Sequence, residues 1–181
     1  MKIKNTFFDD AKIFIPKVYE DERGYFTECF NEVINKEINL PFLQDNHSKS
    51  KKGVIRGLHY QWDKPMGKLL RVITGSIFDV IVDIRPNSST FGKWQGFELS
   101  EDNKHILWAP PGFAHGFLSL EDNTHVCYKT TSLYNSSCDG AINPTNSGLD
   151  IEWPLDASEI ILSEKDALAQ TFKEYSLNPK F

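Results

Sequence analysis

The segment from Gln44 to Lys68 reads QDNHSKSKKGVIRGLHYQWDKPMGK, and its central run is Arg56-Gly57-Leu58-His59-Tyr60-Gln61. The run has the rhythm of a strand, yet it sets an arginine, a histidine and a glutamine beside the packing positions Leu58 and Tyr60. Gly57 predicts a bulge or a close approach of another backbone. Burying an unpaired polar group costs about 1–3 kcal/mol, so a β framework with Arg and His inside usually binds a ligand there. A histidine already satisfied within a packed core is the alternative that this segment leaves open.

On both sides of this segment, short apolar or alternating runs follow one another. They are Lys12–Val18, with Pro16 at an edge or bend, then Leu69–Thr74, Ser76–Ile84, Gly92–Leu99, His105–Ala109, Ala114–Ser119 and Thr124–Ser132. Turn residues separate the runs, and many short strands at close spacing predict a sandwich or a barrel. We therefore expect one mostly β domain over residues 1–181.

Helical patterns are confined to the periphery of this β framework. One short helix is expected over Phe30–Asn39, ended by Pro41, and another in SEKDALAQTFKEY after the N-cap Ser163. The loop Asn135–Leu149 is long and rich in Asn, Ser and Gly, which is typical of a lid or binding loop.

The composition excludes several classes of protein. The 181 residues are 40% hydrophobic with a formal net charge of −5, which indicates a globular domain and disfavours binding to nucleic acid. The three cysteines (Cys29, Cys127, Cys138) form no CxxC pair and are interpreted as free thiols. No leader-like or membrane-spanning apolar stretch occurs, so a cytoplasmic location without membrane contact is expected.

A metal site is not expected. The run Pro110-Pro111-Gly112-Phe113-Ala114-His115 has the PxGxxH shape of a second cupin motif, but the position of the first motif's HxH reads His59-Tyr60-Gln61. Two histidines without a carboxylate make a poor transition-metal site. GxSxG, GxGxxG and Walker A sequences are also absent, which leaves acid–base chemistry without a cofactor.

Acid–base chemistry has clear candidates. His59 is the natural base, because an imidazole titrates near neutral pH, and Tyr128 is a candidate acid on an alternating strand. A base held in one tautomer needs a carboxylate behind it, for which Asp83 and Asp166 are the candidates. Spacing alone does not bring these groups together.

Several motifs occur in a specific order: DERGYFTE, QDNHSKSKKGVIRGLHYQ, GKLLRV, GSIFDVIVDIRPNSSTFGKW, LSEDNKHILWAPPGFAHGF, YKTTSLY, IEWP and LSEKD. The set resembles the dTDP-4-dehydrorhamnose 3,5-epimerase family of the cupin superfamily, from about Ile15 to Asp166. The resemblance implies an all-β, cupin-type jelly-roll barrel with a few short peripheral helices. It also implies a homodimer, no cofactor, and a nucleotide-linked 4-keto-sugar as substrate. In that chemistry a base removes the proton on C3 or C5, and an acid returns one to the opposite face of the enolate.

Carried over by position, the resemblance implies that His59 is the base, Asp166 its orienting carboxylate, Tyr128 the acid and Lys68 the group that stabilises the enolate oxygen. The implied substrate contacts are Arg23, Glu28, Gln44, Asn46, Arg56, His115, Tyr134, Asp139 and Lys165, with Arg23 and Glu28 coming from the N-terminal strands of the partner subunit.

The sequence departs from the family pattern around the nucleotide and sugar. Met66 replaces a usual glutamine, Asp139 stands at an expected glutamate, and a usual tryptophan is missing near Asn143. The expected activity is 3,5-epimerisation of dTDP-4-keto-6-deoxyglucose for surface polysaccharide or deoxysugar synthesis. A GDP- or CDP-linked sugar or heptose, a C3-only epimerase or ketoisomerase, and a non-catalytic nucleotide-sugar-binding cupin are the alternatives.

Overall fold

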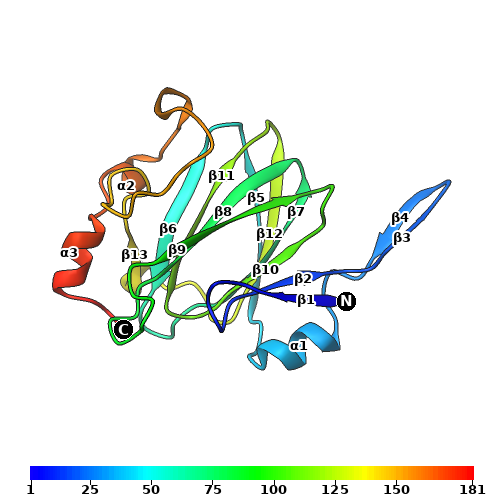
Figure 1. Cartoon of the computed structure of the whole chain (residues 1–181), viewed down its shortest axis with the longest axis horizontal. Coiled ribbons are helices and arrows are strands. Elements are labelled where there is room, and N and C mark those ends of the chain that lie inside the picture. The colour runs from blue at the N-terminus through cyan, green and yellow to red at the C-terminus, as the bar shows by residue number, and fades with distance from the viewer.

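A computed structural model describes residues 1–181 and confirms the all-β, cupin-type architecture, built from two antiparallel sheets that face each other (Figure 1). The first sheet has six strands in the order β1 (Lys2–Asn5), β2 (Lys12–Ile15), β10 (Ile106–Ala109), β7 (Lys68–Thr74), β12 (Thr124–Thr130) and β5 (Gln44–Ser50). The second has five strands in the order β13 (Asp139–Ala141), β6 (Ile55–Gln61), β11 (Phe113–Ser119), β8 (Ser76–Asp83) and β9 (Trp94–Ser100).

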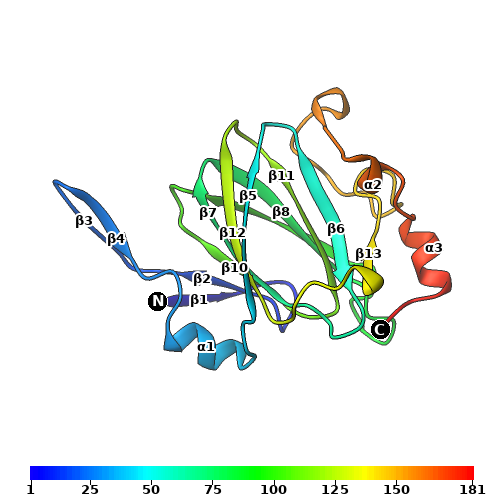
Figure 2. The same cartoon turned by 180° about the vertical axis from the view of Figure 1, so that it is seen from behind.

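The helices lie outside the barrel, as Figures 1 and 2 show. They are α1 (Glu32–Ile38), α2 (Glu164–Ala167) and α3 (Phe172–Leu177), with 3-10 turns at Ser136–Cys138 and Ala157–Glu159. None of them has the length and apolar character needed to cross a lipid bilayer.

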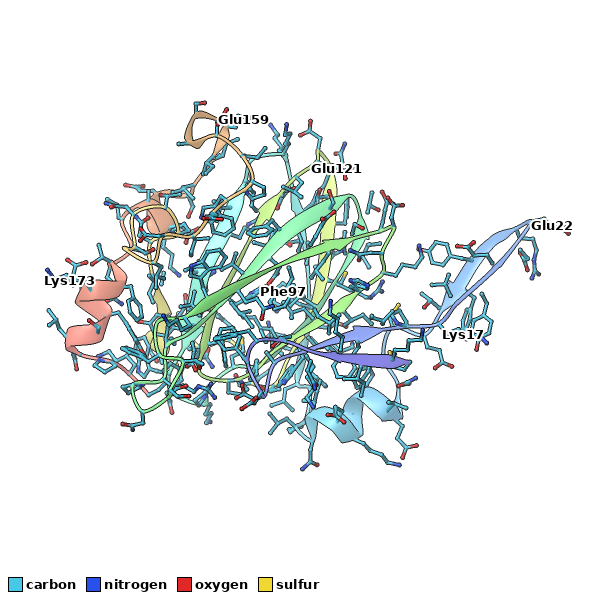
Figure 3. The ribbon with its side chains drawn as sticks, viewed as in Figure 1. Lys17, Glu22, Phe97, Glu121, Glu159 and Lys173 are labelled. Carbon is cyan, nitrogen blue, oxygen red and sulfur yellow. The ribbon has the colours of Figure 1, made fainter.

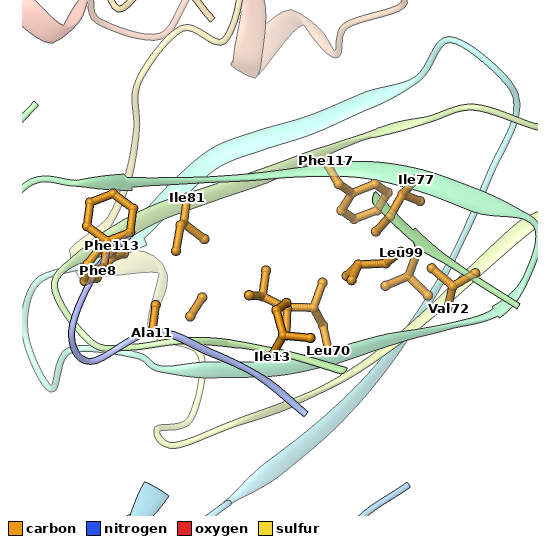
Figure 4. Close-up of a cluster of buried hydrophobic side chains, with 13 residues drawn as sticks. Phe8, Ala11, Ile13, Leu70, Val72, Ile77, Ile81, Leu99, Phe113 and Phe117 are labelled. Carbon is orange, nitrogen blue, oxygen red and sulfur yellow. The ribbon is translucent and has the colours of Figure 1, made fainter. Parts of the chain in front are cut away.

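The apolar run of β8 packs on both of its faces. Ile77 and Ile81 belong to a buried cluster between the two sheets, whereas Val80 and Val82 belong to a second cluster on the other face of the strand. Figure 4 shows the first cluster, which includes Phe8 from the N-terminal segment. Alternate side chains of a strand point to opposite faces, so an uninterrupted apolar run marks a sheet that is covered on both sides.

The predicted irregularity at Gly57 is confirmed. His59 pairs with His115 and Arg56 pairs with Phe117, so three steps along β6 match two steps along β11. Gly57 has φ +134, and a Cβ there would meet Gly116 Cα at 2.4 Å, so only glycine fits. The extra residue brings Arg56 and His59 to the same face of the sheet, although strict alternation would separate them.

Three expectations for the local structure were wrong in detail. The stretch Lys12–Val18 is divided into β2, which lies inside the sheet next to the edge strand β1, and the start of β3. Helix α1 ends at Ile38 because Asn39 takes the left-handed conformation (φ 51) and its N–H bonds to Asn35, before Pro41 is reached.

The C-terminal helix predicted from SEKDALAQTFKEY is two helices. Ser163 caps α2 as expected, but Thr171 and Glu174 form a capping box that starts α3. Between them, Gln170 accepts a backbone hydrogen bond from Asn143, which ties this junction to the predicted lid loop.

The hairpin of β3 (Val18–Asp21) and β4 (Gly24–Thr27) extends away from the barrel. Its two strands pair only with each other, and Figure 3 shows Glu22 at its far end, well away from the sheets. Tyr19, Tyr25 and Phe26 on this hairpin are more than half exposed, at 52%, 56% and 64%.

Candidate active site

A cavity of about 470 Å³ opens between the two sheets. Its walls come from β5, β6, β7, β11, β12 and the segment that leads into α2. The lining side chains are Ser48, Val54, Ile55, Arg56, His59, Lys68, His115, Phe117, Tyr128, Ile161, Leu162, Ser163, Lys165 and Asp166. The four residues predicted to be catalytic (His59, Lys68, Tyr128 and Asp166) are therefore brought together.

His59 and Asp166 form a direct pair. The Nε2 of His59 lies 2.7 Å from Oδ1 of Asp166, whose side chain is 5% exposed. Because a carboxylate only accepts, Nε2–H is the donor, and the lone pair is on Nδ1. Burial opposes ionisation of Asp166, but the hydrogen bonds from His59, Ser163 and the Gly57 amide outweigh it and lower the pKa of Asp166.

Helix α2 is anchored to β6 so that this pair can form. The Ser163 hydroxyl accepts from the Asp166 amide at 3.1 Å, which starts the helix at a defined residue. The preceding segment adds to the β6 end of the sheet through a parallel bridge between Val54 and Ile161, and Ile55 N donates to Ile161 O at 3.0 Å.

Tyr128 faces the cavity from the opposite sheet, as its strand position predicted. It lies on β12 beside Asn46 of β5 and packs against the core cluster between the sheets. Burial raises the pKa of Tyr128, although Arg56 and a hydrogen bond with Asn46 partly counteract this. The phenol is therefore protonated at neutral pH, as an acid must be.

Lys68 begins β7 and lines the same cavity. Burial lowers the pKa of Lys68 to about 8, against the opposing charges of Asp79 and Asp139. An ammonium in such a place interacts strongly with any negative charge that develops near it.

Arg56 and His115 complete the cavity wall. The guanidinium of Arg56 donates to Ser50 Oγ at 3.0 Å and to Lys49 O at 3.1 Å, which holds it at the rim. His115 lies deeper, with Nε2 2.8 Å from Oδ2 of Asp79. Burial lowers the pKa of His115, so a neutral imidazole is favoured.

A second cavity of about 370 Å³ adjoins the first, and His59, Lys68, Tyr128 and Lys165 border both. Its remaining lining residues are Gln44, Asn46, Tyr60, Gln61, Met66, Tyr134 and Asp139. The two cavities together form an elongated site that suits an extended ligand.

The predicted lid loop contributes Asp139 to the wall of this second cavity. Asp139 accepts from the Tyr134 hydroxyl at 3.2 Å and forms an ion pair with Lys165. Gln44 accepts from the Tyr134 amide at 3.2 Å and donates to Asn46 Oδ1 at 2.8 Å. Strand β13, which carries Asp139, pairs with β6 directly beside His59.

Two predicted ligand contacts lie elsewhere in this chain. Arg23 is at the turn of the β3–β4 hairpin, where its side chain is 85% exposed and pairs with Asp21. Glu28 follows β4 and accepts from Asn31 at 2.7 Å. Neither borders the two cavities beside His59.

The alternative carboxylate Asp83 does not orient His59. It is fully buried, but its partners are Arg85, Ser88 and Thr90. Asp166 is the partner of His59, as the family resemblance implied, although residue spacing alone left both carboxylates open.

Sequence reasoning missed Asp79 and the role of Gln61. Gln61 donates to Lys64 O, Ser132 Oγ and Leu133 O and accepts from the Asn135 amide, so it anchors the start of the lid loop. The signal for Asp79 was a carboxylate in the apolar run SIFDVIVDI. The structure has no group of three or more His, Cys, Asp or Glu side chains arranged to hold a metal ion.

The fold and site define a class: a cupin-type barrel enzyme with a histidine–carboxylate pair and a tyrosine on opposite walls of an elongated cavity. The family model of dTDP-4-dehydrorhamnose 3,5-epimerase matches residues 5–174. The chain belongs to this family of isomerases.

Individual relatives agree with this assignment. The dTDP-4-dehydrorhamnose 3,5-epimerase of Methanothermobacter thermautotrophicus is 49% identical over 179 residues, which cover 97% of this chain and 95% of the relative. The Legionella pneumophila enzyme, solved with dTDP-4-keto-L-rhamnose, superposes with a TM-score of 0.90 at 45% identity and covers 95% of this chain and 93% of its own. The Bacillus anthracis enzyme, solved with TDP and PPi, has a TM-score of 0.89 at 41% identity, with 94% and 98% covered.

Proposed function

We propose that this chain, acting as a single domain, catalyses the 3,5-epimerisation of dTDP-4-keto-6-deoxyglucose in dTDP-rhamnose biosynthesis. The observation that carries the proposal is the placement of His59 on one sheet and Tyr128 on the other, across one cavity. Inverting a carbon requires a proton to leave one face and another to arrive on the opposite face. A base and an acid on facing walls meet that requirement.

His59 starts the reaction at its Nδ1, because Nε2–H is engaged by Asp166. The 4-ketone acidifies the C–H bonds at C3 and C5. Nδ1 takes one of these protons, and the electron pair of the broken C–H bond moves into an enolate whose oxygen is the former ketone oxygen. Asp166 stabilises the imidazolium that forms.

Lys68 and Tyr128 complete the exchange. The Lys68 ammonium stabilises the enolate oxygen, an electrostatic contribution of about 3 kcal/mol for one well-placed donor. The Tyr128 hydroxyl then gives its proton to the opposite face of the carbon, and the electron pair of the enolate forms the new C–H bond. Proton exchange with water resets the imidazolium and the phenolate.

The nucleotide end of the substrate is assigned to the remaining cavity residues. Arg56 and Lys165 supply positive charge for a diphosphate, and guanidinium groups suit phosphate oxygens. Gln44, Asn46 and Tyr134 supply polar and aromatic contacts along the second cavity. The relatives from Legionella pneumophila and Bacillus anthracis were solved with dTDP-4-keto-L-rhamnose and with TDP and PPi, which supports a dTDP-linked ligand.

A homodimer is part of this proposal. The β3–β4 hairpin exposes Tyr19, Tyr25 and Phe26, and an isolated two-stranded hairpin is marginally stable in water. A second copy of the chain would cover these aromatic side chains. It would also receive Arg23 and Glu28, which border neither cavity beside the His59 of their own chain.

Proton NMR in D₂O tests the reaction with dTDP-4-keto-6-deoxyglucose and with GDP- and CDP-linked 4-keto-sugars. We expect deuterium at both C3 and C5 of the dTDP sugar. Deuterium at C3 alone would identify a C3-only epimerase. Exchange only with a GDP or CDP sugar would show that Met66 and Asp139, which depart from the family pattern, change which nucleotide sugar the site accepts. Binding without any exchange would support the non-catalytic cupin.

Subunit mixing tests the shared site. Arg23→Ala and His59→Asn homodimers are each expected to be nearly inactive. A mixed dimer has one intact site, so equal mixing should restore roughly a quarter of wild-type activity if subunits exchange freely. Sedimentation showing a fully active monomer would refute the shared site.

A further inference from the structure

Asp79, in the middle of β8, is a buried carboxylate bonded to His115 of the cavity wall. It is 0% exposed and shares the orientation of Ile77 and Ile81, whose side chains point between the two sheets. Its Oδ2 accepts from His115 Nε2 at 2.8 Å, whereas its Oδ1 has no hydrogen-bond partner.

Asp83, four residues further along the same strand, shows how this fold satisfies a purely structural carboxylate. It is equally buried, but its two oxygens accept from the Arg85 guanidinium and amide and from the hydroxyls of Ser88 and Thr90. A buried carboxylate with an unpaired oxygen costs stability, so Asp79 is not explained as a structural clamp of that kind.

Lys68 carries a positive charge without a partner at the same cavity. Its ammonium makes no hydrogen bond or ion pair with another side chain, although it lines the cavity beside His115. Burial lowers the pKa of Lys68 to about 8, and the charge of Asp79 is the largest opposing influence, followed by Asp139. The two groups are thus opposite charges without a direct contact, one buried between the sheets and one at the cavity.

We propose that Asp79 is a positioning residue for the epimerisation: its carboxylate orients the His115 imidazole toward the sugar and supplies the negative charge that balances the Lys68 ammonium. The inference rests on the proposed function, because Lys68 matters here as the group beside the enolate oxygen. Without Asp79, the ammonium would lose its proton more readily inside the barrel.

The hydrogen bond also determines how His115 meets the substrate. Since Nε2–H points to Asp79, Nδ1 of the neutral ring has a free lone pair and accepts a hydrogen bond from a sugar hydroxyl. The other charged or titratable groups around this region are His59 on β6, Tyr128 on β12, Arg56 at the rim, Asp139 on β13, and Lys165 and Asp166 on α2.

Asp79→Asn tests the role of the charge, because asparagine has nearly the same volume and still accepts a hydrogen bond from His115. We expect kcat to fall about tenfold or more at pH 8, and the alkaline limb of the kcat profile to move down by about one pH unit. The matched control is Asp83→Asn on the same strand, assayed well below its melting temperature. It should lose stability but keep the alkaline limb in place.

A direct titration separates this inference from the proposed function. The side-chain NMR resonance of Lys68, assigned through its loss in Lys68→Arg, is followed with pH in ligand-free wild type and Asp79→Asn. We expect the midpoint of the Lys68 pH titration to lie at lower pH in Asp79→Asn than in wild type, whichever sugar is the substrate. If Asp79→Asn does not fold, the titration is done with Asp79→Ser, which removes the same charge.

The outcomes are decisive in either direction. A folded variant with an unchanged Lys68 midpoint and an unchanged alkaline limb would overturn the positioning role. A shifted Lys68 midpoint in a protein that epimerises no 4-keto-sugar would support the electrostatic pairing and reject the proposed function instead.

Discussion

Nε2 of His59 lies 2.7 Å from Oδ1 of Asp166, although 107 residues separate the two along the chain. Strand β6 supplies the imidazole, and the short helix α2, capped by Ser163, supplies the carboxylate. The pair fixes one tautomer of His59 and leaves Nδ1 free at the cavity.

His59→Asn should abolish deuterium incorporation, because no other group at the cavity replaces the base. We expect a loss of about 10³-fold or more in exchange rate at C3 and C5, measured by proton NMR in D₂O. Binding of the dTDP sugar, followed by calorimetry, should persist. His47→Asn removes an exposed imidazole outside the cavity and should leave the exchange rate unchanged; equal losses in both variants would contradict the assignment.

Asp166→Asn should reduce kcat by about 10²-fold or more, because the neutral amide no longer stabilises the imidazolium or holds the tautomer. KM should change much less, since Asp166 acts through His59. Steady-state kinetics measure both constants. Glu164→Gln is the control on the same helix, because Glu164 is exposed. A rise in KM alone, with kcat retained, would show that Asp166 does not act through the base.

Lys68 should set an alkaline limit on activity near pH 8, where burial places the pKa of its side chain. Below this pH the ammonium is charged and stabilises the enolate; above it the neutral amine does not. Burial raises the pKa of Tyr128 above the ordinary value of a phenol, so the loss of the phenol proton lies beyond this limit. Measuring kcat from pH 6 to pH 10 locates the pH at which activity falls.

Lys68→Met provides the matching variant. It should lower kcat by about 10²- to 10³-fold and remove the limb near pH 8 from the residual activity. If kcat of Lys68→Met still falls near pH 8, a group other than Lys68 causes that fall.

Asp83→Asn should destabilise the fold without touching the active site. Burial opposes ionisation, but hydrogen bonds from Arg85, Ser88 and Thr90 prevail and lower the pKa of Asp83 to about 2. A depressed carboxyl pKa contributes stability above its unfolded value near 4 that is lost as pH falls toward 2. We expect a cost of about 2 kcal/mol at pH 7, measured by urea unfolding.

The control for this ion pair is Asp10→Asn, which removes the 45% exposed partner of the same Arg85 guanidinium. It should cost less than about 1 kcal/mol. The difference between wild type and Asp83→Asn should also vanish as the pH approaches 2. A difference that stays constant down to this pH would refute the linkage to ionisation.

Much of the fold was predictable because the patterns are local. Alternating or apolar runs marked β7 to β12, and Gly57 marked the bulge in β6 because a side chain cannot fit against Gly116. The predicted end of α1 was wrong because Asn39 takes the left-handed conformation and ends the helix before Pro41 is reached. The division between α2 and α3 was missed because the Thr171 capping box competes with continuous helix propensity.

The sequence by itself determined the β framework and the residue types for acid–base chemistry, since strand period, turn residues and side-chain chemistry are properties of neighbouring positions. Only the tertiary structure brought Asp166 into contact with His59, placed His59 and Tyr128 on opposite walls, and joined the buried Asp79 to His115. The physical reason is that hydrogen bonds and charge interactions depend on distances of a few ångströms. Those distances arise from sheet pairing between segments that are far apart in the chain.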